Sequence, residues 1–336
     1  MIALPLFSEK HKLGLDIGSA FIKVCLPNRS GKPVVARVAT PEGSVSKGVL
    51  QNAELLRDAL RQMVRQQNLT NNQVVATLPA STLVLRHIQI PMLKPRETAE
   101  AVEWEARRVL PFALEEAQMD WLRQGTVVSE EGEMQDILLV AVRDAVVERY
   151  ISAVQETGLK LVALDVAPLA LGRWLLKGSE GSSLIMDMGS ETTQLHFFVN
   201  SKLIFSRSLS IGGVQASRAI QNYLGNNFAE SETLKLRGEY QEEWLEAWHS
   251  ELGREIQRSL EYYHSNFNNF DNNEESQFDR VILSGGASST RGIEELIKDI
   301  TSVEPGYAEF SSRLRTPRHD RIMYNVALGA GLWEGK

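Results

Sequence analysis

The chain has 336 residues, 43% hydrophobic and 24% charged, a composition that excludes disordered, collagen-like and low-complexity proteins and predicts two or three compact domains. Its 43 acidic and 36 basic side chains give a formal net charge of −7, which repels phosphate backbones and anionic lipids, so we expect no nucleic-acid binding. The single cysteine, Cys25, excludes an intrachain disulfide and fits a reducing compartment.

The chain opens with the apolar residues 1–7, but the polar residues 8–10 end this stretch at once. It has no basic region before it and no cleavage site after it, so it is not a signal peptide. No later apolar run approaches the roughly 20 residues that a membrane-spanning helix needs. The sequence therefore predicts a cytoplasmic protein without a membrane segment.

Residues 13–26 have the pattern of two short strands joined by a tight turn, with Asp-Ile-Gly-Ser at the turn. Gly18 allows a positive φ and lets backbone N–H groups approach a phosphate, and Ser19 adds a hydroxyl donor. Asp16 lies at the strand end, where a carboxylate suits Mg²⁺ because this ion prefers oxygen ligands and keeps several waters. The hairpin is a candidate phosphate-binding corner.

Helix and strand patterns alternate through the next hundred residues. We predict a helix over 53–67, strands over 74–78 and 83–90, a helix over 97–110, a strand over 136–142 and a helix over 145–157. The part from about 80 to 157 has the character of a small α+β insert.

The pattern of the first hairpin returns halfway along the chain, where Asp-Met-Gly-Ser at 187–190 joins strands at 184–186 and 193–198. One such tetrapeptide more often just closes a hairpin. Two of them in equivalent settings predict related domains that present the same turn to a common cleft. Asp16 and Asp187 would then face one Mg²⁺-bound triphosphate.

Two glycine pairs follow in the second half of the chain. Gly212-Gly213 opens a helix from residue 214, and on its own it is interpreted as a structural bend. The strand at 280–283 runs into Ser-Gly-Gly-Ala at 284–287, with a helix over 291–300 behind it. Glycines there admit a ligand to the backbone, and a helix N-terminus adds oriented N–H donors. Residues 225–264 are largely helical and acidic.

Five parts of the chain resemble the motifs of the actin-like ATPase superfamily in their order: the hairpin at 13–26, the segment 165–171, the hairpin at 184–198, the turn at 284–287 and the segment 324–331. They match its two phosphate motifs, adenosine motif and two connecting helices. A further set of segments resembles the PilM family of type IV pilus assembly proteins: Ile88-Gln89-Ile90-Pro91, Glu103-Trp104-Glu105-Ala106, Leu110-Pro111-Phe112 and residues 255–263. The resemblance covers nearly the whole chain.

This resemblance implies an α/β fold of two duplicated actin-like (ribonuclease H-like) domains around a nucleotide cleft, with an FtsA-like subdomain insert. The implied first core domain (1A) takes residues 1–79, 158–180 and 322–336, and the inserted subdomain (1C) takes 80–157. The second core domain (2A) takes 181–215 and 275–321, and a small helical subdomain (2B) takes 216–274.

The resemblance further implies ATP and Mg²⁺ as cofactors. The implied nucleotide-binding residues are Asp16, Gly18, Ser19, Lys23, Asp187, Gly189, Ser190, Thr192, Gly212, Gly213, Ser284, Gly285, Gly286 and Ala287, with Mg²⁺ held by Asp16 and Asp187 through water. Where hydrolytic relatives have a glutamate, this chain has Ala167, which cannot orient a water. Asp165 is the alternative catalytic candidate, although it could equally cap a helix. We therefore expect slow or absent hydrolysis.

The implied function is a cytoplasmic adaptor in type IV pilus biogenesis. It would bind the N-terminal cytoplasmic peptide of a PilN-like inner-membrane protein beside the insert, with ATP tuning the assembly, and would reach the membrane only through that partner. Leu93, Trp104 and Phe112 are the candidate contacts. Three alternatives stay open: an MshI-type adaptor, a self-associating FtsA- or MreB-like filament, and a small-molecule kinase. The kinase would need an acid–base residue beside its acceptor, and no aspartate in a sugar-kinase-like acceptor loop is evident.

Overall fold

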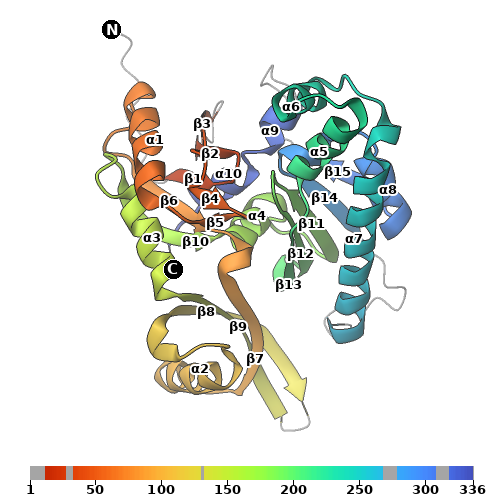
Figure 1. The fold of residues 1–336 in the computed structure, drawn as a ribbon. Helices are drawn as coiled ribbons and strands as arrows, with labels where there is room; N and C mark the ends of the chain where they lie inside the picture. The colour runs from red at the N-terminus through yellow and green to blue at the C-terminus, as the bar shows by residue number, and fades with distance from the viewer. Residues whose placement is uncertain (1–11, 28–32, 130–131, 268–277, 308–317, 336) are drawn as a thin grey trace.

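The computed structural model describes residues 12–27, 33–129, 132–267, 278–307 and 318–335. It contains two five-stranded sheets, a three-stranded sheet and a short two-stranded hairpin. Figure 1 shows the first large sheet on the left, the second on the right and the three-stranded sheet below them. Within the described residues, no helix has the length and apolar character needed to cross a membrane.

The first sheet has the strand order β10-β6-β1-β2-β3. Its strands are β1 (Leu13–Ile17), β2 (Phe21–Leu26), β3 (Val34–Ala39), β6 (Gln73–Leu78) and β10 (Lys160–Val166). β1, β2 and β3 form an antiparallel meander, and β6 and β10 run parallel to β1. Helix α1 (Ala53–Gln66) packs its buried leucines onto this sheet's core. We call this sheet with its helices the first half.

The second sheet repeats that topology with the order β13-β12-β11-β14-β15. Its strands are β11 (Ser182–Met188), β12 (Thr193–Val199), β13 (Lys202–Leu209), β14 (Arg280–Ser284) and β15 (Pro305–Tyr307). Again the first three are antiparallel neighbours, and the last two run parallel to the first of them. The predicted duplication of an α/β domain is therefore confirmed. We call this part the second half.

Helices enclose the second half on its outer side (Figure 1). They are α5 (Gly213–Leu224), α6 (Phe228–Arg237), α7 (Glu246–Phe267), α8 (Ile293–Thr301) and the short α9 (Arg318–Ile322). The apolar faces of α5, α6, α7 and α8 join those of β11, β12 and β14 in one core. The predicted helix at 291–300 is found two residues later, because Gly286–Ser289 first forms a 3-10 turn.

The insert consists of β7 (Leu83–Pro91), β8 (Ala117–Ser129) and β9 (Gly132–Arg143), in the order β7-β9-β8, with α2 (Pro95–Val109) packed on one face. α2 begins at Pro95, since proline is accommodated in the first turn of a helix. Strand β8 was not predicted. Its Ala117, Asp120 and Gly125 have low strand propensity, and its pairing with β9 holds it in place.

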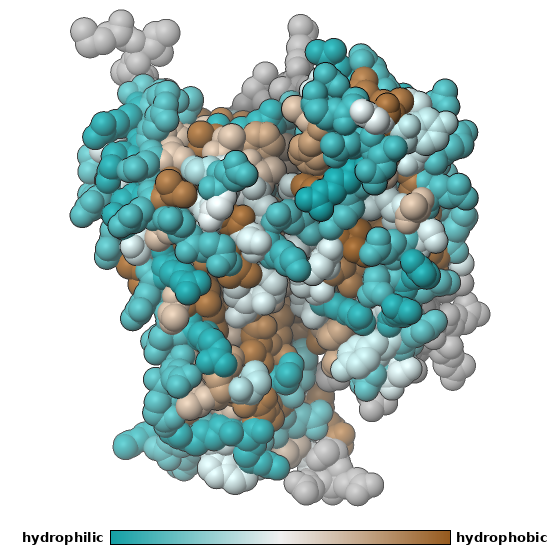
Figure 2. Space-filling view, in the orientation of Figure 1, coloured by the Kyte–Doolittle hydropathy of each residue, from teal (hydrophilic) through white to brown (hydrophobic). Residues whose placement is uncertain are grey.

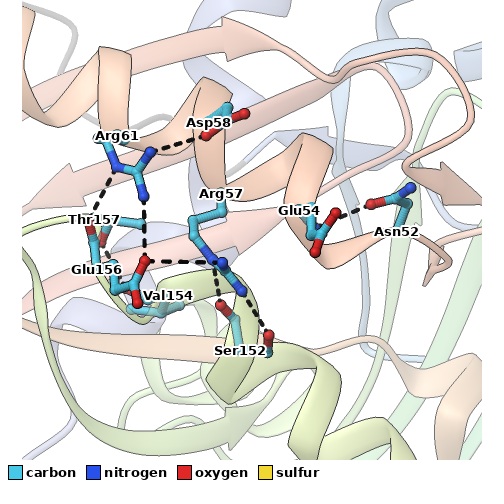
Figure 3. A network of polar contacts seen from close by, with 9 residues as sticks. All are labelled: Asn52, Glu54, Arg57, Asp58, Arg61, Ser152, Val154, Glu156 and Thr157. Atoms are coloured by element: carbon cyan, nitrogen blue, oxygen red, sulfur yellow. Dashed lines mark hydrogen bonds and ion pairs between the residues drawn. The ribbon is translucent and has the colours of Figure 1, made fainter.

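Helix α3 (Asp144–Val154) follows the insert but packs against α1 of the first half. Figure 3 shows the polar contacts between them: Arg57 donates to the carbonyl of Ser152 (2.9 Å), and Arg61 donates to the carbonyl of Glu156 (3.1 Å). The helix ends at Val154, three residues earlier than predicted. The domain boundaries remain predictions, and this packing favours ending the insert before α3.

Two helices lie between the halves, α4 (Ala167–Leu175) and α10 (Asn325–Gly331). Their backbones touch, because a Cβ on Gly329 would stand 1.9 Å from the carbonyl oxygen of Ala170. α10 also lies directly on β1, where a Cβ on Gly14 would stand 1.8 Å from the carbonyl oxygen of Ala327. The two connecting helices therefore form a close-packed junction at which the halves meet.

Candidate functional site

The two acidic turns have the same backbone geometry. In the first, the Gly18 N–H donates to the carbonyl of Phe21 (3.1 Å), and in the second the Gly189 N–H donates to the carbonyl of Thr192 (2.8 Å). A Cβ on Gly18 or Gly189 would stand 3.1 Å from the carbonyl oxygen that accepts its own N–H, and this close approach favours glycine in both turns. Neither glycine has a positive φ, so the conformation predicted for Gly18 is wrong. Both predicted hairpins are thus present.

Both turns open into a single pocket between the halves. The predicted nucleotide-binding residues that line it are Asp16, Gly18, Ser19, Lys23, Asp187, Gly189, Ser190, Thr192, Gly213, Gly285, Gly286 and Ala287. Ser284 and Gly212 do not line it. The structure thus brings the two aspartates to one cavity, as the repeated motif predicts.

Different neighbours hold the two carboxylates. Lys23 Nζ lies 2.5 Å from Asp16 Oδ2, and the Ser284 hydroxyl donates to Asp187 Oδ1 (2.8 Å). Burial raises the pKa of the Asp187 carboxyl, and the charge of Asp16 adds to this, whereas Lys23 and the Ser284 hydroxyl oppose it. Ser284 therefore acts on the pocket by positioning Asp187, although it does not line the pocket.

The two glycine pairs differ in what they do. A Cβ on Gly212 would stand 2.6 Å from the carbonyl oxygen of Ser190, so this glycine lets the start of α5 lie against the second turn. Gly212 therefore has the role of a structural bend. Gly213 lines the pocket. Gly285 has a φ of +79°, and a Cβ there would stand 2.4 Å from the carbonyl oxygen of Met188. Only glycine fits that position.

Asp165 lies outside the pocket and is only 7% exposed. Its Oδ1 accepts from the Val166 N–H (2.8 Å), and its Oδ2 accepts from Arg173 Nη1 (2.7 Å). The same Arg173 nitrogen donates to the carbonyl of Gly329 (2.8 Å). Arg173 thus ties α4 to α10, and the Asp165 carboxylate of β10, which holds Arg173, is not free to orient a water in the pocket. Asp165 is therefore not placed to act as the catalytic residue that was considered, whereas Ala167 lines the pocket.

Six polar residues that line the pocket are not predicted by the sequence motifs: Thr77 of β6, Glu191 of the second turn, Gln194 and His196 of β12, and Glu232 and Lys235 of α6. Lys235 Nζ donates to Glu232 Oε2 and to the carbonyl of Gly213, each at 2.8 Å. Burial lowers the pKa of Lys235, and Glu232 opposes that shift. Nothing in the amphipathic pattern of α6 distinguishes these two residues from an ordinary exposed pair.

The pocket suits a magnesium nucleotide in its donor chemistry. No group of three or more potential metal-ligating side chains occurs among the described residues, so a metal cage made by protein alone is absent from this part of the chain. Mg²⁺ is usually held by one or two carboxylates together with water and substrate phosphates. Asp16 and Asp187 supply that number beside two glycine turns, and therefore fit the ion.

The three candidate partner contacts all lie on the insert. Trp104 on α2 is 61% exposed, and its ring is covered on one side by the Arg108 guanidinium, 4.9 Å from the ring centroid. Leu93 and Phe112 are partly exposed, and Arg143 lies 4.5 Å from the Phe112 ring. Figure 2 shows hydrophobic residues on this face where the insert meets the rest of the molecule.

Comparison with known proteins gives consistent matches along the chain. The sequence model of the family described as "Type IV pilus assembly protein PilM" matches residues 14–325. A chain of the solved "PilM-PilN type IV pilus biogenesis complex" is 25% identical with a TM-score of 0.81, covering 96% of this chain and 98% of its own.

More distant likenesses show the fold alone. The ethanolamine utilization protein EutJ from Carboxydothermus hydrogenoformans is 17% identical, with a TM-score of 0.60 and coverage of 98% of this chain and 91% of its own. MreB5 of Spiroplasma citri, solved with ADP, is 14% identical, with a TM-score of 0.57 and coverage of 96% and 95%.

Proposed function

The chain belongs to the PilM family of type IV pilus assembly proteins, and from that premise we propose that it is an adaptor for a PilN-like inner-membrane protein. It binds the N-terminal cytoplasmic peptide of that partner. The observation that carries the proposal is the whole-chain likeness to the PilM chain of a PilM–PilN complex. The protein then lies in the cytoplasm, at the inner membrane through its partner.

The insert is the proposed docking region for the peptide. It carries Trp104, whose exposed indole offers the large, rigid contact area that dominates many interfaces. Leu93 and Phe112 lie on the same subdomain. The hydrophobic strip in Figure 2 borders this region and supports an apolar peptide contact there.

The pocket between the halves is proposed to hold ATP with Mg²⁺. Support comes from the convergence of both acidic turns and the Gly285-Gly286 backbone on one cavity. When bound, the ion would lie near Asp16 and Asp187 and balance the charge of the phosphates. Nucleotide would favour one placement of the halves across α4 and α10, and that placement would favour the peptide.

Hydrolysis is proposed to be slow or absent. Ala167 lines the pocket where a water-orienting carboxylate would be needed, and Asp165 is engaged by Arg173. A kcat near or above roughly 1 per second, an ordinary lower value for enzymes, would contradict this part of the proposal.

Calorimetry with a synthetic peptide tests the proposal. The peptide is the N-terminal tail of the PilN-like protein from the same organism, titrated into the full chain with and without Mg-ATP. We expect one peptide per chain and tighter binding with nucleotide; linkage then requires the peptide to raise ATP affinity by the same factor. No binding under either condition would contradict the adaptor role, and equal binding would contradict only the tuning.

A matched pair of variants locates the surface. Trp104→Ala should weaken peptide binding roughly tenfold or more. Tyr223→Ala removes a comparably exposed aromatic ring (65%) from the second half and should leave it unchanged. Equal effects of the two variants would contradict docking at the insert.

A further inference from the structure

One apolar cluster joins the insert to the second half, and we call it the junction cluster. Besides residues of α4 and α10, its buried members are Leu138 of β9, Ile185 of β11, Phe198 of β12 and Leu203 of β13. Among the described residues, none of its members belongs to a strand of the first sheet. In Figure 1 the edge strand β13 lies on the side of the second half that faces the insert, and it contacts β7.

The root of the insert, by which we mean Leu83 and Val142, belongs to the first half instead. Val142 near the end of β9 is part of the core of the first half, and Leu83 at the start of β7 packs on that core. Farther along the same two strands, Leu138 and Leu85 pack in the junction cluster. The chain therefore connects the insert to the first half, but the middle of the insert packs on the second half.

Two side chains of the insert also bind one backbone carbonyl of the second half. Strand β13 is an edge strand, and the outward-facing backbone groups of such a strand need partners. The Leu203 carbonyl accepts from Gln124 Nε2 of β8 (3.1 Å) and lies 3.0 Å from His87 Nε2 of β7. A carbonyl has two lone pairs and no proton, so the imidazole donates from Nε2. A proton on Nδ1 would be met by the Asp136 carboxylate, 3.4 Å away. We call Leu203, Gln124 and His87 the Leu203 clamp.

The local geometry of β8 aims Gln124 at this carbonyl. The pairing of β8 with β9 shifts register between Arg123 and Gly125, so Gln124 is an extra residue in a β-bulge, a feature that re-aims a side chain. Gln124 is only 8% exposed, and its Oε1 has no hydrogen-bond partner. A leucine could fill this place without leaving a buried oxygen unpaired. The hydrogen bond to Leu203 is therefore what the amide contributes here.

We propose that the insert and the second half move as one body, held by the junction cluster and the Leu203 clamp, and that this body transmits nucleotide binding to the peptide-docking region. The common movement does not depend on the proposed function, whereas its effect on the peptide rests on it. Ala167 and Val326 connect the two regions, because both line the pocket and both pack in the junction cluster. Helix α4 is pressed onto the same body, since a Cβ on Gly172 would stand 2.6 Å from the Phe198 ring.

The consequence is a displacement between the insert and the first half. When nucleotide changes the placement of the halves, the insert follows the second half, and its root takes up the movement. A peptide that docks beside the insert and also contacts the first half then gains or loses contacts. Differential contacts of this kind link the two affinities.

Double electron–electron resonance on the full chain tests the common movement. Spin labels are placed in pairs at exposed positions, Arg96 on the insert, Lys298 on the second half and Asp58 on the first half, in a Cys25→Ala background. In the free protein, the Arg96–Lys298 distance distribution should be narrower than the Arg96–Asp58 distribution. With Mg-ATP, only the latter should shift. Equally broad distributions, or a shift in Arg96–Lys298 alone, would overturn the proposal.

Calorimetry on Gln124→Leu tests the transmission. The readout is the linkage factor, the ratio of the peptide Kd without Mg-ATP to that with it, which should be roughly fivefold or more in the wild type and below about twofold in Gln124→Leu. The Kd of each ligand alone should change less than about twofold, because neither site is altered. Gln118→Leu is the matched control: Gln118 lies on the same strand but donates to Asp144 of α3 (2.8 Å), so the variant should keep the wild-type factor.

The outcomes separate this proposal from the proposed function. An unchanged factor in Gln124→Leu, or an equal loss in Gln118→Leu, would overturn the role of the clamp. A wild-type chain that binds no Mg-ATP or no peptide contradicts the proposed function, and a wild-type factor of one contradicts both the tuning and its transmission. In each of these cases the distance distributions of the free protein still decide whether the insert moves with the second half.

Discussion

In the first half Asp16 is paired across its hairpin with Lys23, whereas in the second half the residue opposite Asp187 is Gln194. The parallel neighbour strands differ as well. Ser284 of β14 donates to the Asp187 carboxylate, but Thr77 of β6 donates to the carbonyl of Leu15 (3.3 Å). The two halves thus share a backbone arrangement but differ in the side chains around their aspartates.

The difference gives each half its own role in the pocket. The first half brings a cation, Lys23, to its aspartate, and the second half surrounds its aspartate with neutral polar groups. A duplicated scaffold can therefore present similar turns to one ligand while one aspartate is paired with a cation and the other with uncharged side chains. The following variants exchange or remove these differences, from the largest expected effect to the smallest.

The two halves differ at Gly285, because the matching register position in the first half is Leu78, the last residue of β6. Gly285→Val should lower the free energy of unfolding by more than about 3 kcal/mol, since its φ is positive and the Met188 carbonyl blocks a Cβ. Gly178→Ala, also at positive φ but with open space around it, should cost about 1 kcal/mol. Chemical denaturation measures both, and equal losses would contradict the steric argument.

His196 lies opposite Ile185, at the register position that Cys25 occupies opposite Gly14 in the first half. The folded chain keeps His196 neutral, with a pKa lowered to about 3, whereas the unfolded chain binds a proton near pH 6.5. The unfolded state therefore binds more protons between these values, and stability falls as the pH is lowered through them.

The slope from this group is up to about 1.4 kcal/mol per pH unit. His196→Cys, which copies the first half, should remove about 2 kcal/mol of the loss between pH 6.5 and 5. Denaturation at several pH values measures it, with Cys25→Ala as the control that should keep the wild-type slope. A wild-type slope in His196→Cys would show that His196 is not buried in its neutral form.

Lys23→Gln places a glutamine opposite Asp16, as Gln194 lies opposite Asp187 in the second half. It leaves Asp16 and Asp187 without their shared cation, so Mg-ATP affinity should fall roughly tenfold. Lys298→Gln, at an exposed ion pair on α8, is the control and should have no effect. Calorimetry decides between them, and a loss common to both variants would point to net charge alone.

Ser284→Ala tests the neighbouring strand. Loss of its hydrogen bond to Asp187 should weaken Mg-ATP binding by about 1 kcal/mol, near fivefold. Thr77→Val removes the corresponding hydroxyl of the first half. Thr77 also lines the pocket, but its hydroxyl donates to the Leu15 carbonyl and not to Asp16, so affinity should change less than twofold. An equal loss in Thr77→Val would show that the two strands position their aspartates alike.

The parts of this fold that could be predicted from sequence are those set by local patterns. The two hairpins, α1 and the glycine turn after β14 each follow from a short run of residue types whose geometry is nearly fixed. The strands and the helix predicted at 83–90, 136–142 and 97–110 are present, but β8 was missed because its strand state depends on β9 rather than on its own composition.

The site was predicted less completely for the same reason. Asp165 looked available for catalysis because its partner Arg173, which also donates to the Gly329 carbonyl, is brought to it only by helix packing. Gln194 was missed because nothing in a buried strand distinguishes a residue facing a cavity from one facing the core. Tertiary packing alone supplies that distinction.

The measurement that tests the central claim most directly is a double-mutant cycle on Mg-ATP binding, with Asp16→Asn, Asp187→Asn and the double variant titrated by calorimetry. If both carboxylates act on one magnesium nucleotide, the losses should be coupled by at least about 1 kcal/mol, and the double variant should differ from the sum of the single ones. Strictly additive losses, or a loss from only one aspartate, would show that the two turns do not serve a common ligand.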